Sequence, residues 1–209
     1  HHDSAGTSGI IGEGDVQWMT AGSGLLHKEY HEEEFSKTGG PFQMVQLWVN
    51  LPAKDKKTKP KYQEISNQVM GRAYLPDEKS FIEVIAGEYN GVKGPAFTFT
   101  HMQLYNARLK KNATAKLKFP ANYNTGLLVV KGKALMNGSE VNADHFVLFK
   151  NDGEEISVEA TEDSIILVLS GEPIDEPIAA YGPFLMNTWQ EVEQAINDVN
   201  AGKFGVLED

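Results

Sequence analysis

Short runs of apolar residues recur along the chain, and they are separated by glycine, asparagine, aspartate and proline. Several runs alternate apolar with polar positions and are rich in Val, Ile, Phe and Trp, which is typical of β-strands. We expect strands over residues 14–19, 44–49, 81–86, 97–102, 127–130, 145–149, 156–160 and 164–169. Many short strands joined by glycine-rich turns predict an all-β protein, built as a sandwich or a barrel.

One segment near the C-terminus shows helical periodicity instead. Thr188 and Glu191 form the T-x-x-E pattern of a capping box, and Gly202 is placed to end a helix. The apolar residues between them share one helical face: Trp189, Val192, Ile196 and Val199. The pattern predicts a helix over 188–200 that buries this stripe against a barrel wall.

A polar, lysine-rich stretch over residues 54–60, closed by a proline, is the best candidate for a linker between domains. The residues before it are few for a barrel of about eight strands, whereas residues 61–172 can supply a complete barrel. We therefore expect a partial N-terminal barrel over 1–53 and a C-terminal barrel over 61–172. A final segment over 173–209 carries the helix.

Composition and charge limit the classes of function. Hydrophobic residues make up 41% of the chain, which is ordinary for a globular protein, and no apolar run approaches the roughly 20 residues of a membrane-spanning helix. The net charge of −10 argues against direct binding to nucleic acid. Cysteine is absent, so His, Asp and Glu must hold any metal. We expect a soluble, cytoplasmic protein.

The most informative group of polar residues lies within residues 25–31. If this stretch is a strand, alternation places His27, Glu29 and His31 on one face. Two imidazoles and a carboxylate suit a first-row metal with nitrogen and oxygen ligands. The alternative is a polar, solvent-facing strand edge beside the acidic run at 32–34. The small residues at 20–24 favour a hairpin that pairs this strand with the strand at 14–19.

Three motifs carry a resemblance to a known family. Residues 14–29 read GDVQWMTAGSGLLHKE, residues 45–52 read VQLWVNLP, and residues 182–188 read GPFLMNT. They resemble the pirin signatures G-D-[VL]-Q-W-M-T-A-G-x-G-[IL]-x-H-x-E, L-Q-L-W-V-N-L-P and G-P-F-V-M-N-T, in the same order. The first motif matches at every fixed place, and the three together extend over nearly the whole chain.

The resemblance implies two tandem cupin barrels, with the first incomplete here and the second without a metal. Pirins hold one metal, usually iron, through two histidines of an upstream H-x-H and the later H-x-E pair, here His27 and Glu29. The upstream H-x-H has no counterpart in this sequence, so the chain is expected to begin partway through the first barrel. Residues 1–3 resemble the H-x-D stretch that follows the first ligands; a remnant of a purification tag is the alternative for His1 and His2.

With two of four ligands, the site is expected to hold its Fe(II), or another divalent first-row metal, weakly or not at all. Restoring the upstream ligands is expected to restore the metal. His31 matches no pirin ligand and is expected behind the ligands or on the surface. His101 and His145, in the second barrel, are expected to be structural or exposed.

Two functions remain open on the resemblance. The first is a quercetin 2,3-dioxygenase, which opens a flavonol ring with O₂ and releases carbon monoxide. Glu29 would then be the catalytic base that accepts the enol proton. The alternative is a redox-sensitive, iron-binding regulator that is not an enzyme and acts through protein partners.

Overall fold

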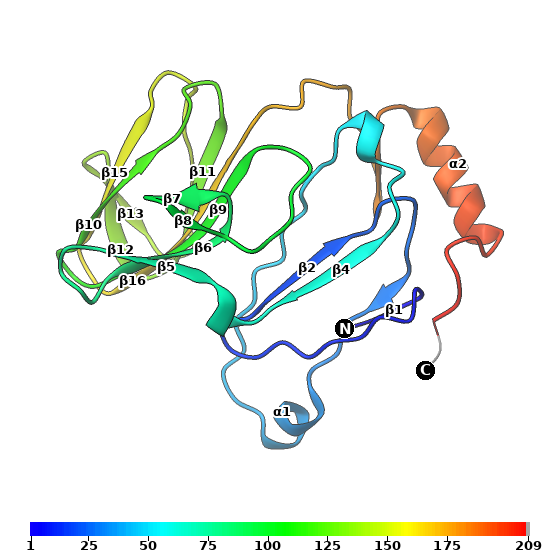
Figure 1. The fold of residues 1–209 in the computed structure, drawn as a ribbon, viewed down its shortest axis with the longest axis horizontal. Helices are drawn as coiled ribbons and strands as arrows, with labels where there is room; N and C mark the ends of the chain where they lie inside the picture. Colours follow the sequence, from blue (N-terminus) through cyan, green and yellow to red (C-terminus); the bar gives the residue numbers. More distant parts are fainter. Residues whose placement is uncertain (208–209) are drawn as a thin grey trace. The chain divides into compact units, whose positions relative to one another are not determined.

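The computed structural model describes residues 1–207, which form two compact units (Figure 1). The N-terminal unit combines His1–Glu64 with the described residues from Ile174 onward, and the C-terminal unit is Ile65–Pro173. These boundaries differ from the expected ones. Residues 61–64 belong to a strand of the N-terminal unit, and the final segment returns to that unit instead of standing apart.

The C-terminal unit is made almost entirely of strands. It starts with the 3-10 helix η2 (Asn67–Val69). Its strands are β5 (Gly71–Tyr74), β6 (Phe81–Ala86), β7 (Glu88–Tyr89), β8 (Val92–Lys93), β9 (Met102–Leu109), β10 (Thr114–Lys118), β11 (Asn124–Lys131), β12 (Lys133–Met136), β13 (Ser139–Asn142), β14 (Phe146–Leu148), β15 (Glu155–Ala160) and β16 (Ser164–Gly171).

Two antiparallel sheets of the C-terminal unit share one core. One has the order β14-β11-β16-β9-β6-β5 and the other β10-β15-β12-β13. Inward positions of both sheets are apolar and buried, as alternation along a strand requires. Buried members of this core include Ile82, Tyr105, Leu127 and Val168 from the first sheet and Leu117, Met136 and Val158 from the second.

The N-terminal unit has shorter strands, and these pair two by two as β1-β3, β2-β4 and β17-β18. Its elements are β1 (His2–Asp3), β2 (Val16–Thr20), β3 (His27–Lys28), α1 (Glu33–Thr38), η1 (Ala53–Asp55), β4 (Lys61–Ile65), β17 (Ala179–Tyr181), β18 (Phe184–Met186) and α2 (Trp189–Asn200). The predicted all-β class with one long C-terminal helix is confirmed. The 54–60 stretch overlaps the end of η1, so it is not an irregular linker throughout.

Helix α2 begins where its cap predicts. The Thr188 side chain accepts from the backbone N–H of Glu191, and the Glu191 carboxylate accepts from the backbone N–H of Thr188. The Thr188 hydroxyl and the backbone N–H groups of Asn187 and Thr188 donate to the Glu191 carboxylate and lower the pKa of this carboxyl. The helix packs on β17 and β18, and Val192 is 1% exposed. Trp189, expected to be buried, is 62% exposed, because three-residue strands, roughly 10 Å long, cover only part of the helix.

Two expected strands do not form. Residues 44–49 carry no helix or strand, and their apolar side chains are exposed, Trp48 at 65%. Residues 97–101 are likewise irregular, and β9 begins only at Met102. Apolar composition alone does not make a strand, since a strand needs a neighbour to accept its ladder of hydrogen bonds.

A short helix, α1, was not expected. The side chain of Glu32 accepts from the backbone N–H of Phe35, which lowers the pKa of the Glu32 carboxyl, and Glu33 and Glu34 lie in the first turn. Acidic side chains there complement the partial positive charge of the helix N-terminus. The acidic run at 32–34 therefore caps and begins a helix.

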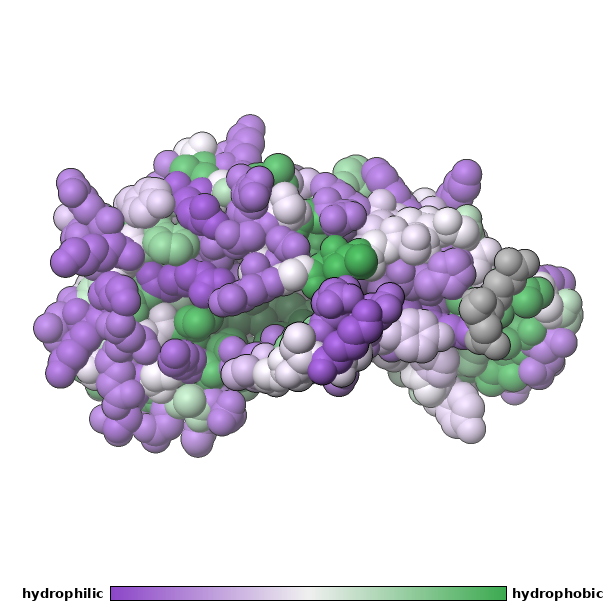
Figure 2. Space-filling view, turned by 90° about the horizontal axis from the view of Figure 1, so that it is seen from below, coloured by the Kyte–Doolittle hydropathy of each residue, from purple (hydrophilic) through white to green (hydrophobic). Residues whose placement is uncertain are grey.

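Hydrophilic residues cover most of the face drawn in Figure 2, with smaller apolar patches between them. Within the described part of the chain, no helix is both long enough and apolar enough to cross a membrane.

Candidate metal centre

The two expected ligands come from a short antiparallel ladder. Strand β3 pairs with β1, so that His27 lies opposite Asp3 and Lys28 opposite His2. The predicted hairpin between β2 and β3 is wrong, because β2 pairs with β4 instead. The neighbours of β3 are therefore residues near the N-terminus.

Glycines in the turn before β3 allow other parts of the unit to approach closely. Gly22 has φ +53°, and a Cβ there would lie 2.2 Å from the backbone oxygen of Thr58. At Gly24, with φ +127°, a Cβ would collide with the ring of Phe204. The glycines of the first motif thus place β3 against two distant segments, a role that the sequence alone does not show.

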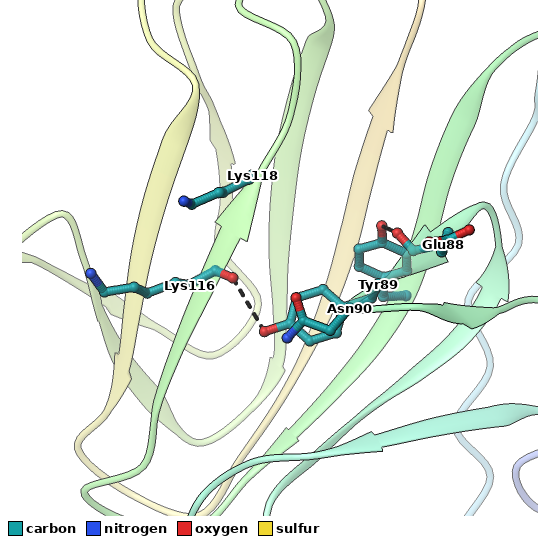
Figure 3. A pocket seen from close by; sticks show the side chains of 6 residues that line it. Glu88, Tyr89, Asn90, Lys116 and Lys118 are labelled. Atoms are coloured by element: carbon teal, nitrogen blue, oxygen red, sulfur yellow. Dashed lines mark hydrogen bonds between the residues drawn. The ribbon is translucent and has the colours of Figure 1, made fainter.

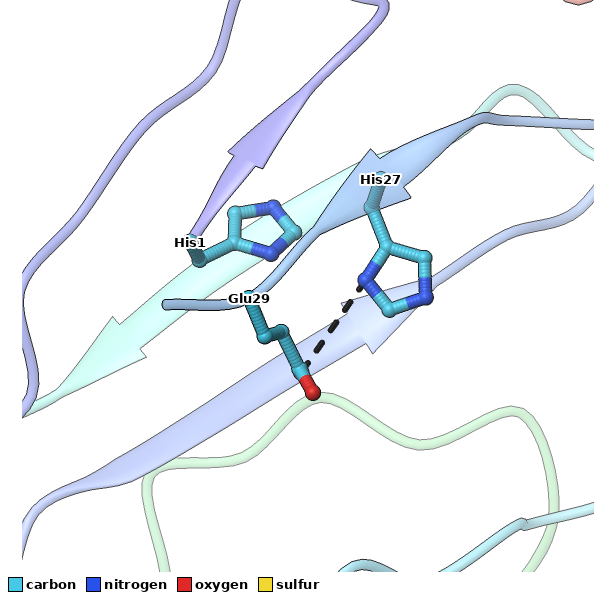
Figure 4. Close-up of side chains that lie close together, drawn as sticks. All are labelled: His1, His27 and Glu29. Atoms are coloured by element: carbon cyan, nitrogen blue, oxygen red, sulfur yellow. Dashed lines mark ion pairs between the residues drawn. The ribbon is translucent and has the colours of Figure 1, made fainter. Parts of the chain in front are cut away.

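His27 and Glu29 face each other at the end of β3 (Figure 4). Nδ1 of His27 lies 3.9 Å from Oε1 of Glu29, and their side chains are 35% and 38% exposed. Strand β3 ends at Lys28, so Glu29 is not in the strand, contrary to the expectation. Nitrogen and oxygen donors bind a first-row metal at about 2.1 Å, so two donors of one ion are at most about 4.2 Å apart. His27 and Glu29 fit such an ion.

His1 lies beside this pair (Figure 4). Donor atoms of His1, His27 and Glu29 all lie within 4.8 Å of one another, the one such group among residues 1–207. The His1 ring is buried, 4.8 Å from the ring of Tyr62 and 5.6 Å from that of His27. The register of β1 against β3 brings it there.

Both ring nitrogens of His1 already have partners within the protein. Nε2 lies 3.1 Å from Oδ2 of Asp3, and Nδ1 lies 2.8 Å from Nε2 of Gln17. Asp3 is buried, and its Oδ1 accepts from the backbone N–H groups of Ala5 and Thr7. A metal would have to break one of these bonds to reach His1. We therefore place His1 in the wall of the site and not among the ligands.

The remaining candidate histidines lie elsewhere. His31 is exposed, and its ring lies 5.7 Å from that of Phe35 and 4.9 Å from that of Phe42. Since β3 ends before it, alternation does not carry His31 to the face of His27. His101 and His145 are exposed in the C-terminal unit, where Nδ1 of His145 lies 2.9 Å from the backbone oxygen of Ala143.

The C-terminal unit contains a cavity of about 340 Å³ (Figure 3). It is lined by Glu88, Tyr89, Asn90, Tyr105, Lys116 and Lys118. The hydroxyls of both tyrosines donate to backbone oxygens, and burial raises the pKa of each phenol. With a raised pKa both phenols stay protonated near neutral pH, so neither can act as a base. The lining also includes no histidine, and this cavity therefore does not resemble a metal centre.

Comparisons with known proteins identify the family. The sequence model of the pirin family matches residues 1–49, and that of the pirin C-terminal cupin domain matches residues 104–205. A Pseudomonas aeruginosa protein, provisionally named a quercetin 2,3-dioxygenase, is 44% identical over 98% of this chain and 71% of its own length. The chain belongs to the pirin family. Pirin-1 of Arabidopsis thaliana is 36% identical over the same shares of the two chains.

A solved structure shares the fold of this pirin. The crystal structure of a quercetin 2,3-dioxygenase from Acinetobacter baumannii superimposes with a TM-score of 0.95, is 44% identical, and covers 99% of this chain and 72% of the other. The predicted cupin fold is thereby confirmed.

Proposed function

We propose that this pirin is a metal-dependent dioxygenase that opens flavonols such as quercetin, with His27 and Glu29 among the metal ligands. The observation that carries the proposal is the 3.9 Å separation of Nδ1 of His27 and Oε1 of Glu29, which lets both atoms reach one ion. Relatives named as quercetin 2,3-dioxygenases support the substrate class.

The chemistry that a bound Fe(II), or another divalent first-row metal, supplies is Lewis-acid activation of an enol hydroxyl and an open position for dioxygen. The residues of this chain bind the metal and accept the proton. His27 and Glu29 would offer the metal one nitrogen and one oxygen donor. The Glu29 carboxylate accepts the enol proton of the flavonol. Asp3 and Gln17 hold the His1 ring in the wall beside His27.

Turnover of quercetin tests the proposal. The protein is loaded with Fe(II) without oxygen and then mixed with quercetin in aerated buffer, and loss of quercetin, uptake of O₂ and release of carbon monoxide are measured together. We expect the three to proceed in equal amounts. Glu29→Gln should lower kcat about 10²-fold or more, because it removes both a ligand and the base. His145→Ala, a change at an exposed histidine of the C-terminal unit, should leave the rate unchanged.

Iron-loaded protein that consumes no quercetin would contradict the proposal. If the same protein changed its affinity for a partner protein with the oxidation state of iron, the regulator would be the better description.

A further inference from the structure

The side chain of Gln46 contacts Glu29 directly. Gln46 lies in the second motif, within residues 41–50, which form no helix or strand. Its Nε2 lies 3.0 Å from Oε2 of Glu29. An ionised carboxylate only accepts hydrogen bonds, so the amide of Gln46 donates. This bond joins two segments that are 17 residues apart.

The bond makes the two oxygens of Glu29 different. Oε2 is held by the amide of Gln46, whereas Oε1 lies 3.9 Å from Nδ1 of His27. The backbone does not fix this orientation, because β3 ends at Lys28 and the Glu29 side chain is partly exposed. Without the amide, the carboxylate would be free to turn among several rotamers.

We propose that Gln46 is a positioning residue: its amide holds the Glu29 carboxylate by Oε2 and so presents Oε1 to the metal. This inference rests on the proposed function. Gln46 acts through Glu29, the residue to which it donates. Hydrogen-bond partners of metal ligands typically contribute 10- to 100-fold to metal affinity, because they orient the ligand before the ion arrives.

Because Gln46 is exposed, an effect of its substitution on metal binding can be separated from an effect on folding. An exposed side chain in an irregular segment contributes little to folding stability, so a substitution there should not unfold the protein. Gln46→Met keeps the length of the side chain and removes the donor. Gln46→Glu places a second carboxylate against Oε2. Gln43→Met, three residues earlier in the same exposed segment, is the matched control.

The experiment measures Co(II) binding by competition with a chromophoric chelator, together with the visible spectrum of the Co(II) protein and the melting temperature of the metal-free protein. We expect Gln46→Met to weaken Co(II) binding about 10-fold or more and to change the spectrum. Gln46→Glu should weaken binding further, and both melting temperatures should stay at that of the wild type. Gln43→Met should match the wild type in all three measurements.

Equal Co(II) affinities and spectra for the wild type and Gln46→Met would overturn this inference alone. A fall in melting temperature that matched the loss of affinity would also overturn it, since Gln46 would then serve folding. If the wild type bound no Co(II) even with the upstream H-x-H of the family restored, the proposed function would fail, and this inference with it.

Discussion

Nδ1 of His27 and Oε1 of Glu29 lie 3.9 Å apart although β3 ends between the two residues, at Lys28. The chain leaves the β1–β3 ladder at this point, yet the carboxylate still turns back toward the imidazole. His27 and Glu29 therefore share a face through their side chains and not through a continued strand. The metal prediction depends on this pair.

With the upstream H-x-H of the family restored, we expect His27→Ala to lower the iron content of metal-loaded protein at least 10-fold, because it removes one of the two donors that this geometry brings together. Elemental analysis after loading with Fe(II) and gel filtration measures the content. His145→Ala is the control, since His145 is exposed and its Nδ1 lies 2.9 Å from the backbone oxygen of Ala143 in the C-terminal unit. Full iron occupancy in His27→Ala would show that the ligand is wrongly assigned.

Docking of α2 should depend on Val192 and not on Trp189. Val192→Ala removes two buried carbon atoms, and at about 0.8 kcal/mol each plus the cavity left behind it should cost about 2 kcal/mol of the free energy of unfolding. Trp189→Ala should change it by less than about 0.5 kcal/mol, because the indole is 62% exposed. Urea unfolding of both variants measures the difference. A larger loss for Trp189→Ala would mean that α2 packs through another face.

Gly22 should not tolerate a side chain. In Gly22→Ala the new Cβ would meet the backbone oxygen of Thr58 at 2.2 Å, in addition to the strain of a positive φ. We expect a loss of more than about 1 kcal/mol in the free energy of unfolding. Gly6→Ala is the control, since Gly6 also has a positive φ but has open space around its Cβ position. If both variants lost the same stability, the contact with Thr58 would have no effect of its own.

Features fixed by near neighbours in the sequence could be predicted. The capping box of α2 depends on Thr188 and Glu191, which are three residues apart, and the helix begins at the predicted place. Alternation in a core strand depends on residues two apart, and β15 follows it. Such patterns are complete within one segment, so the sequence alone reveals them.

Features that depend on distant partners could not be predicted. The neighbour of His27 is Asp3, not a residue of β2, and the exposure of Trp189 follows from the short β17–β18 pair beneath it. The wall formed by His1 and Gln17, and the bond from Gln46 to Glu29, likewise join separate segments. The resemblance to pirins pointed to the motifs that contain Gln17 and Gln46, but it gave no role to either side chain.

Glu83 has partners on both oxygens within the C-terminal unit. The carboxylate is buried, with Oε1 accepting from Arg72 and Asn67 and Oε2 from Arg108 at 2.9 Å. Burial alone would raise the pKa of this carboxyl, but the bonds from Arg108, Asn67 and Arg72 outweigh it and hold the pKa below its ordinary value of 4.5. Glu83 therefore stays charged in the folded protein at pH values where an unfolded chain would bind a proton.

For this reason the free energy of unfolding of the C-terminal unit should decrease as the pH is lowered. Below a pH of about 4.5 the unfolded chain binds more protons at Glu83 than the native protein does. The contribution of Glu83 to the free energy of unfolding is therefore complete above that pH. It is lost as the pH falls through the lower pKa of the native state. Glu83→Gln should cost about 2 kcal/mol near neutral pH and flatten the pH dependence below 4.5. Glu159→Gln, at an exposed position of β15, should keep the slope of the wild type. Urea unfolding between neutral and acidic pH measures all three proteins. An unchanged acid slope in Glu83→Gln would show that other carboxylates, and not this one, govern the acid sensitivity of the protein.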